Sequence, residues 1–357
     1  NISVFRGTPR KDWFIRGTKK FRIIPGTIIP LFDGSTPLKS SHTTLCLPFQ
    51  FSQPNYYFMR TKPAVNMRLT GRAVALILIL CCISLYSNCQ PNLNRPTKVG
   101  YAPVNGLKMY YEIYGEGEPL ILLHGAFNTI HLAFGTLIPD LARNRQIIAV
   151  ELQGHGHTAD IDRPFSFESM ADDVAALLKY LKVDSADVFG YSMGGCIAWQ
   201  LAIRHPKSVR KLIVASGVYK YEGWTPETRA ILPNITPQVF EGTPIKSEYD
   251  SVAPDPKHWT QFVNKMKKFI TTPYNFTAEK IKEIKSPTLI IAGDGDGVLP
   301  EHAVEMFRLR HGKYMVDFGP APTTQLAILP GTSHISVMMQ TNWLVSMITP
   351  FLDASAH

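Results

Sequence analysis

Short apolar runs alternate with amphipathic segments from about Thr97 to the end of the chain. Several runs are apolar on both faces, as strands buried in a parallel sheet are. Because such runs alternate with helical patterns, the chain is predicted to form an α/β fold, a mostly parallel sheet covered by helices. The runs that we interpret as strands are 107–114, 119–124, 146–151, 186–190, 211–216, 287–293 and 325–330.

The segment 166–183 carries the clearest helical pattern. Its apolar residues fall on one face of a helix, and they are Met170, Val174, Leu177, Leu178 and Leu181. Further helices are predicted at 196–205, 301–310 and 342–353. The interval of about 217–284 breaks the alternation, because it holds several prolines, no clear strand, and a helix-like piece at 259–269. We interpret this interval as a small helical cap over the carboxyl edge of the sheet, within a domain at 98–357.

Residues 67–89 have the parts of a secretory signal peptide. A short basic segment from Met67 to Arg72 precedes eleven unbroken apolar residues at 73–83. This run is well short of the roughly 20 residues that span a bilayer as a helix. We expect cleavage after Cys89 and export to the periplasm or the medium. A lipid anchor on Cys89, an uncleaved anchor and a buried helix remain alternatives.

Residues 1–66 begin with Asn1 and show no clear helical or strand periodicity. A signal peptide lies near the start of translation, so Met67 is the natural beginning in this interpretation. We therefore expect residues 1–66 to be an upstream extension that is poorly ordered.

The formal charge of +9 does not describe the predicted domain. Residues 1–89 hold 12 of the 37 Lys and Arg and 2 of the 28 Asp and Glu, which leaves 25 and 26 for the rest. The basic character therefore gives no reason to expect a nucleic-acid partner for the domain. Only Cys196 lies beyond residue 89, so the domain has no internal disulfide.

A candidate nucleophile lies in the segment Gly190-Tyr191-Ser192-Met193-Gly194-Gly195. The segment follows a predicted strand and precedes a predicted helix, which is the context that makes G-x-S-x-G informative. In this context the serine sits on a sharp turn that exposes its hydroxyl, and the glycines let strand and helix approach closely. We predict that Ser192 is a catalytic nucleophile.

A serine hydroxyl needs a base, and the base needs a carboxylate that orients it. His334 follows the last predicted strand, and Asp296 follows the strand before it. Both would therefore reach the sheet edge that carries Ser192, in the chain order serine, aspartate, histidine. Asp294 is a rival acid that we expect to close the turn instead. Two other histidines, at 302 and 311, are expected at the surface.

The oxyanion of an acyl-transfer intermediate needs two backbone donors. We predict that the N–H groups of Met193 and Ala126 supply them, and that His124 is a structural hydrogen-bonding residue. The pair His155 and His157 raises the question of a metal site, but no Cys or further ligand cluster accompanies it. We interpret these two histidines as part of a turn.

Together these residues resemble the α/β-hydrolase superfamily, specifically its single-domain esterase, lactonase and cofactor-free haloperoxidase-like branch. The resemblance covers about residues 98–357 and is carried by 124–125, 151–156, 190–195, 293–300 and 331–334. It implies an α/β-hydrolase fold with eight strands, the second of them antiparallel, and the three catalytic residues at the carboxyl edge. Many relatives have an aromatic residue where this chain has Ala126.

The resulting expectation is a serine esterase that cleaves carboxylic esters with small or medium acyl chains. Phe127, Tyr191 and Trp224 are expected to contact substrate. Further cap aromatics either line an acyl pocket or pack the cap onto the core, and they are Trp259, Phe262 and Tyr274. A lactonase, a carbon–carbon bond hydrolase, a perhydrolase and a non-catalytic binding protein remain alternatives. No nucleotide loop or zinc spacing is present, so no cofactor, metal or nucleic acid is expected.

Overall fold

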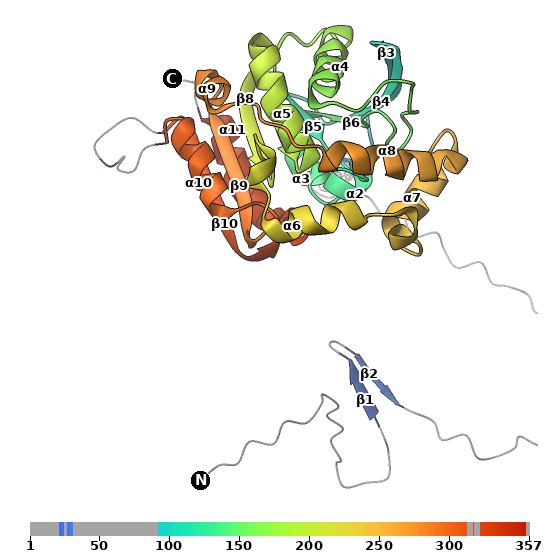
Figure 1. The fold of residues 1–357 in the computed structure, drawn as a ribbon. Helices are drawn as coiled ribbons and strands as arrows, with labels where there is room; N and C mark the ends of the chain where they lie inside the picture. Colours follow the sequence, from blue (N-terminus) through green and yellow to red (C-terminus); the bar gives the residue numbers. More distant parts are fainter. Residues whose placement is uncertain (1–20, 25–26, 31–91, 313–316, 318–321, 355–357) are drawn as a thin grey trace, which may run out of the picture. The chain divides into compact units, whose positions relative to one another are not determined.

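A computed structural model describes residues 21–24, 27–30, 92–312, 317 and 322–354 of the chain. The chain divides into two units, residues 1–70 and 71–357. Figure 1 colours the described residues along the chain. The predicted signal peptide at 67–89, with Cys89, lies outside the described residues.

The first unit contains an antiparallel pair of strands, β1 (Phe21–Ile24) and β2 (Thr27–Pro30). The sequence shows no clear strand periodicity at these positions, and that residues 1–66 are a poorly ordered upstream extension stays a prediction. Both strands carry adjacent isoleucines, which favour an extended backbone.

The second unit is built on a sheet of eight described strands in the order β10-β9-β8-β7-β5-β6-β4-β3. The strands are β3 (Lys98–Val104), β4 (Leu107–Tyr114), β5 (Glu118–Leu123), β6 (Arg145–Val150), β7 (Ala186–Tyr191), β8 (Val209–Ala215), β9 (Thr288–Gly295) and β10 (Thr324–Ser333). Strand β4, the second strand of this sheet in chain order, runs antiparallel to both of its neighbours, β3 and β6. The other described pairs in this sheet are parallel. The predicted α/β-hydrolase fold is confirmed.

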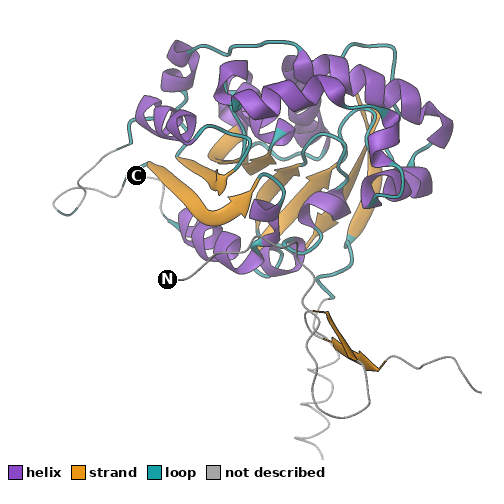
Figure 2. Ribbon diagram, turned by 60° about the horizontal axis from the view of Figure 1, so that its bottom comes forward, coloured by secondary structure: helices purple, strands orange, loops and turns teal. Residues whose placement is uncertain are grey.

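Helices cover both faces of this sheet, which Figure 2 shows as orange strands between purple helices. The helices are α2 (Ile130–Phe134), α3 (Ile138–Leu141), α4 (Phe167–Tyr180), α5 (Met193–Arg204), α6 (Pro226–Ile231), α7 (Pro244–Val252), α8 (Trp259–Thr271), α9 (Ala278–Glu283), α10 (Pro300–Leu309) and α11 (Thr341–Asp353). One buried apolar cluster packs α4, α5 and α10 on one face. A second cluster packs α2, α3 and α11 on the other.

The central strands are buried on both faces, and each residue from Leu120 to Leu123 in β5 is fully buried. This burial explains the continuous apolar runs in the sequence. The predicted helix at 166–183 is α4, and its buried face includes Met170, Val174 and Leu177. Ser166 caps α4, because its hydroxyl accepts a hydrogen bond from the N–H of Ser169.

The segment between β8 and β9 contains α6 to α9, where we expect the cap. Helix α8 is tied to the loop after β6, because Nζ of Lys265 lies 2.7 Å from Oδ1 of Asp160. The rings of Tyr249 in α7 and Phe262 in α8 stack with centroids 5.3 Å apart. Among the described residues, no helix is long and apolar enough to cross a bilayer.

Candidate active site

Ser192 stands between β7 and α5 with a backbone that few residues adopt, at φ 55° and ψ −117°. The turn is possible because two glycines allow close backbone contact on either side of it. A Cβ on Gly190 would lie 2.2 Å from the carbonyl oxygen of Gly194, and a Cβ on Gly194 would lie 2.0 Å from that of Leu123. The local sequence therefore holds the serine on a strained strand-to-helix turn.

His334 follows β10 and reaches Ser192 across the carboxyl edge of the sheet. Its Nε2 lies 2.9 Å from Oγ of Ser192. Its Nδ1 lies 2.7 Å from Oδ1 of Asp296, which follows β9. The Asp296 side chain is fully buried, whereas that of His334 is 31% exposed. The structure thus brings together the three residues that the sequence predicts.

Asp296 is held by four hydrogen bonds. Oδ1 accepts from His334 and from the N–H of Val298, and Oδ2 accepts from the hydroxyl of Ser216 and the N–H of Gly293. Burial by itself would raise the pKa of Asp296, but the bonds from His334, Ser216 and Gly293 outweigh it and hold this pKa below its ordinary value. The carboxylate is therefore ionised at neutral pH and can stabilise a protonated His334.

The rival residues lie elsewhere. Asp294 accepts the N–H of Thr332 at 3.2 Å, so it closes the turn as expected. His302 is not at the surface as we expected: it is 3% exposed, and its Nδ1 lies 2.9 Å from Oε2 of Glu305. The helical pattern did not show that this side of α10 faces the core. His311 lies two residues beyond the last residue of α10 and is exposed.

The predicted oxyanion donors lie next to Ser192. A Cβ on Gly125 would lie 3.2 Å from that of Ser192, so the backbone leading to Ala126 passes close to the nucleophile. Met193 is the first residue of α5, where the N–H has no partner within the helix. Among the described residues, no acceptor is bonded to the N–H of Ala126 or of Met193. Both donors are therefore open to a ligand.

Trp224 lies against the catalytic histidine. Its ring meets that of His334 edge to face, with centroids 5.6 Å apart. Its indole N–H donates to the hydroxyl of Tyr274 at 3.1 Å, and its backbone pairs with Val298 beside Asp296. These contacts fix Trp224 as an apolar wall next to His334.

Phe127 and Tyr191, the other two residues that we expected to contact substrate, lie in different surroundings. Phe127 is half-buried, and its ring lies 4.8 Å from that of Phe240 and 5.9 Å from that of Phe262. The structure does not support a substrate contact for Tyr191, because its side chain is buried in the core and its hydroxyl donates to the carbonyl of His334. The sequence places Tyr191 beside Ser192, but the residue before the serine belongs to β7 and points into the sheet packing.

The cap aromatics Trp259 and Phe262 are 5% and 1% exposed, so they pack the cap onto the core. Tyr274 is half-buried and bonds Trp224 and Sγ of Cys196. The alternative in which all three line an acyl pocket is therefore not supported by their burial.

His155 and His157 are held within the turn that follows β6. Nδ1 of His157 lies 2.9 Å from Oε2 of Glu151, and this hydrogen bond raises the pKa of His157. Nδ1 of His155 lies 3.0 Å from the carbonyl oxygen of Gln153. Within the described part of the chain, no group of three or more His, Cys, Asp and Glu could hold a metal ion.

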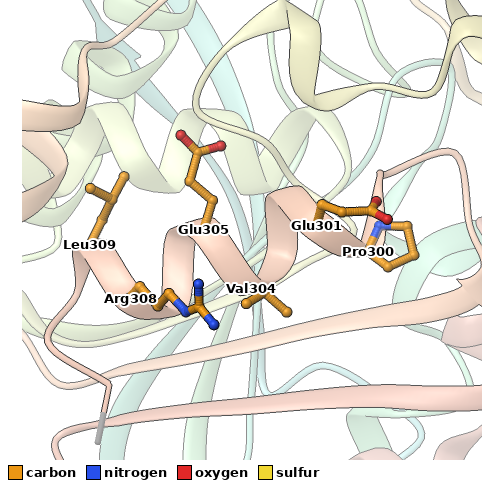
Figure 3. A pocket seen from close by; sticks show the side chains of 6 residues that line it. All are labelled: Pro300, Glu301, Val304, Glu305, Arg308 and Leu309. Carbon is orange, nitrogen blue, oxygen red and sulfur yellow. The ribbon is translucent and has the colours of Figure 1, made fainter.

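A shallow hollow along α10 contains none of the three predicted catalytic residues. Figure 3 shows its lining side chains, which are Pro300, Glu301, Val304, Glu305, Arg308 and Leu309. All six come from one helix, and the chemistry at the carboxyl edge of the sheet does not involve them.

Comparison with known proteins gives the same fold. A model of the α/β hydrolase fold family matches residues 118–247. The chain is 33% identical over 112 residues to a 2-hydroxymuconate semialdehyde hydrolase from Pseudomonas sp. strain CF600, a match of 30% of this chain and only 40% of the relative. It is 30% identical over 226 residues to the AB hydrolase superfamily protein YisY of Bacillus subtilis, which covers 54% of this chain and 79% of that protein.

Among solved structures, the chain resembles an enol-lactonase from Burkholderia xenovorans LB400. The TM-score is 0.56 at 22% identity, over 71% of this chain and 100% of the other. At this identity the likeness shows the fold alone. Together with the family match and the relative from Bacillus subtilis, it shows that this chain belongs to the α/β-hydrolase superfamily.

Proposed function

We propose that this protein is a serine hydrolase that cleaves carboxylic esters with small or medium acyl chains. The observation that carries the proposal is the continuous hydrogen-bonded line from Ser192 Oγ through His334 to Asp296. Membership of the superfamily supports hydrolase activity, and the ester substrate is our inference from the chemistry of the site.

In the first half of the reaction, Ser192 attacks the ester carbonyl while Nε2 of His334 takes its proton. Asp296 accepts the hydrogen bond from Nδ1, so it keeps the tautomer in which Nε2 is free to act as a base. The same geometry stabilises the imidazolium, which then protonates the leaving alcohol. This half-reaction leaves an acyl group on Ser192.

In the second half, His334 takes a proton from water as the water attacks the acyl group. The proton returns to Ser192 as the acid leaves. Both halves pass through a tetrahedral oxyanion, which the N–H groups of Met193 and Ala126 would bind. Each such donor contributes on the order of 100- to 1,000-fold to the rate in related chemistry. Neither half-reaction needs a cofactor or metal.

The apolar surroundings support an ester of modest size. Trp224 is held beside the His334 ring, and the ring of Phe127 in the oxyanion loop contacts that of Phe262 in the cap. Side chains of this kind favour an uncharged acyl chain over a charged substrate. Nitrophenyl acetate, butyrate and octanoate are therefore suitable first substrates.

Hydrolysis of a carbon–carbon bond is a second candidate on the same residues. It is favoured by relatives named 2-hydroxymuconate semialdehyde hydrolase and 2-hydroxy-6-oxo-2,4-heptadienoate hydrolase, each 33% identical over part of the chain. A comparison of kcat/KM on the nitrophenyl esters, on lactones and on a 2-hydroxy-6-oxo-dienoate separates these reactions. Selectivity among them depends on the cap and pocket, because the three catalytic residues are shared.

Export through residues 67–89 is a separate proposal, supported by the basic start and the apolar run of that segment. Expression of residues 67–357 in a bacterial host, so that Met67 starts the chain, followed by mass spectrometry of the amino-terminal peptide of the exported product, tests it. We expect a product that begins at Gln90. A product retained in the cell with residues 67–89 intact would contradict the proposal.

The test of the proposed reaction uses the full chain beside Ser192→Ala, with the three nitrophenyl esters and a fluorophosphonate label. We expect ester turnover and labelling of the wild type, both lost in Ser192→Ala. Labelling without ester turnover would favour lactones or the dienoate. Folded wild-type protein with neither signal would overturn the enzyme proposal in favour of a binding protein.

A further inference from the structure

Two buried histidines join the loop that carries Ala126 to the loop that follows β6. His124 precedes Ala126, and His155 belongs to the second loop. Their rings lie 4.8 Å apart, and the side chains are 0% and 1% exposed. The chemistry proposed above uses neither histidine directly.

The hydrogen-bond partners define the tautomer of each ring. Nδ1 of His124 lies 2.8 Å from the carbonyl oxygen of Gly125, and Nδ1 of His155 lies 3.0 Å from that of Gln153. A carbonyl oxygen can only accept, so each Nδ1 carries the hydrogen. Each Nε2 is then free to accept, and that of His124 accepts the N–H of Leu152 at 3.2 Å.

Burial lowers the pKa of both imidazoles, and for His155 the proximity of His124 lowers it further. Both rings are therefore neutral at neutral pH. Only a neutral ring offers the Nε2 lone pair, so the state that burial favours is the one that the hydrogen bonds require.

Nε2 of His155 accepts the N–H of Phe127 at 3.2 Å. Phe127 has a φ of 62°, in the left-handed region that a residue with a bulky side chain rarely adopts. The peptide unit that this hydrogen bond holds joins Ala126 to Phe127. The bond therefore fixes the backbone immediately after the expected oxyanion donor.

The rest of the loop is fixed by Asn128. Its backbone N–H donates to the carbonyl of Gly125 at 3.3 Å, and its side-chain amide donates to the carbonyl of Ala126 at 3.1 Å. Although these bonds and the one to His155 hold the loop, the N–H of Ala126 has no acceptor among the described residues.

We propose that His155 is a positioning residue for the oxyanion site: through the N–H of Phe127 it holds the loop so that the N–H of Ala126 points at the reacting carbonyl. The proposal rests on the proposed function, because it assigns a role within that site. His155 also meets the ring of Phe262 in α8, with centroids 4.9 Å apart and an interplanar angle of 85°. The same residue therefore links the oxyanion loop to the cap.

The test compares three variants in the full chain: His155→Gln, His155→Asn and His155→Leu. A glutamine can place an acceptor oxygen near the position of Nε2, whereas asparagine is too short to do so and leucine has no acceptor. His157→Gln serves as the control, because His157 lies in the same turn but bonds Glu151 and stacks on the ring of Tyr110. Active sites are titrated with fluorophosphonate, so that turnover is expressed per competent site.

We expect His155→Asn and His155→Leu to lower kcat about 10- to 100-fold, less than the roughly 100- to 1,000-fold for complete loss of an oxyanion donor, with little change in KM. Affinity for a trifluoromethyl ketone, whose adduct carries an oxyanion, should fall by a similar factor. His155→Gln should retain at least about ten times the turnover of His155→Asn, and His157→Gln should match the wild type.

Equal per-site turnover of His155→Gln and His155→Asn would overturn the proposal, and so would an unchanged ketone affinity in both. If His155→Leu does not fold, the comparison of the glutamine and asparagine variants still decides. Failure of the proposed function is distinguishable, because the wild type itself would then show neither labelling nor turnover of any substrate.

Discussion

The hydroxyl of Ser216 donates a hydrogen bond to Oδ2 of Asp296, the carboxylate oxygen that His334 does not contact. Ser216 follows β8, the strand that lies between those leading to Ser192 and Asp296. The carboxyl edge thus supplies a residue that supports the acid without touching the histidine. No motif in the sequence distinguishes this serine from others.

Removal of this bond by Ser216→Ala should lower kcat about 10-fold, because a hydrogen bond to a charged group contributes on the order of 1.5–3 kcal/mol. It should also raise the pKa of Asp296, since the Ser216 bond is one of the causes that lower it. As the pH is lowered, the variant should therefore lose activity at a higher pH than the wild type does, and a pH–rate profile measures this difference. The control is Ser286→Ala, a buried serine whose hydroxyl bonds the carbonyl of Val209. Equal profiles for the two variants would contradict this role.

Trp224 offers a test of the pocket next to His334. Trp224→Ala removes the ring that meets the imidazole and opens space beside the acyl group. We expect the ratio of kcat/KM for nitrophenyl octanoate to that for acetate to rise about 10-fold, the lower end of the 10- to 200-fold that one methylene group contributes in a hydrophobic pocket. Trp224→Phe, which keeps a ring but not the N–H bonded to Tyr274, should stay near the wild-type ratio. An unchanged ratio in the alanine variant would place the acyl chain elsewhere.

The ion pair between Lys265 and Asp160 offers a test of cap attachment. Asp160 is 8% exposed and bonds Lys265 through both carboxylate oxygens. Lys265→Met removes the ammonium group that balances the charge of the Asp160 carboxylate. The free energy of unfolding should therefore fall by about 1–3 kcal/mol. Lys268→Met, at an exposed position of the same helix, should have little effect. Denaturant unfolding of both variants checks the difference, and equal stabilities would show that the pair does not anchor α8.

The buried histidines predict a pH dependence of stability. The pKa of His155 is lowered in the folded protein, whereas in the unfolded chain it is near the ordinary 6.5. Below that pH the unfolded chain binds more protons, so the stabilising contribution is present above about pH 6.5 and is lost as the pH falls toward the folded pKa. The loss approaches about 1.4 kcal/mol per pH unit for one group. His155→Gln should reduce this slope between about pH 6.5 and 5. Unfolding curves with the same slope for both proteins would contradict the assignment.

Much of the fold was predictable because buried parallel strands leave a simple pattern. The apolar runs placed seven of the strands, and α4 followed from its helical spacing. The edge strand β3 was not among the predicted runs, because four of its seven residues are exposed and its apolar pattern is weak. The pair β1 and β2 was missed because its strands are only four residues each.

The site was predictable where chemistry restricts the residue types. Ser192, Asp296 and His334 each follow a strand, and parallel strands bring such residues to one edge. Side-chain direction was not predictable in the same way. Tyr191 is adjacent to Ser192 in sequence but is buried in the core, and Ser216 and His155 act through contacts with distant segments. Only the three-dimensional arrangement shows those contacts.

In the reaction that we propose, Ser192 is a nucleophile activated by His334. Mass spectrometry of the full chain after fluorophosphonate treatment tests it most directly, beside Ser192→Ala and His334→Ala. We predict a single adduct on the peptide that contains Ser192, absent from Ser192→Ala and formed at least about 1,000 times more slowly in His334→Ala, in line with the loss of a triad member. An adduct on another residue, or equally fast labelling of Ser192 without His334, would contradict the account.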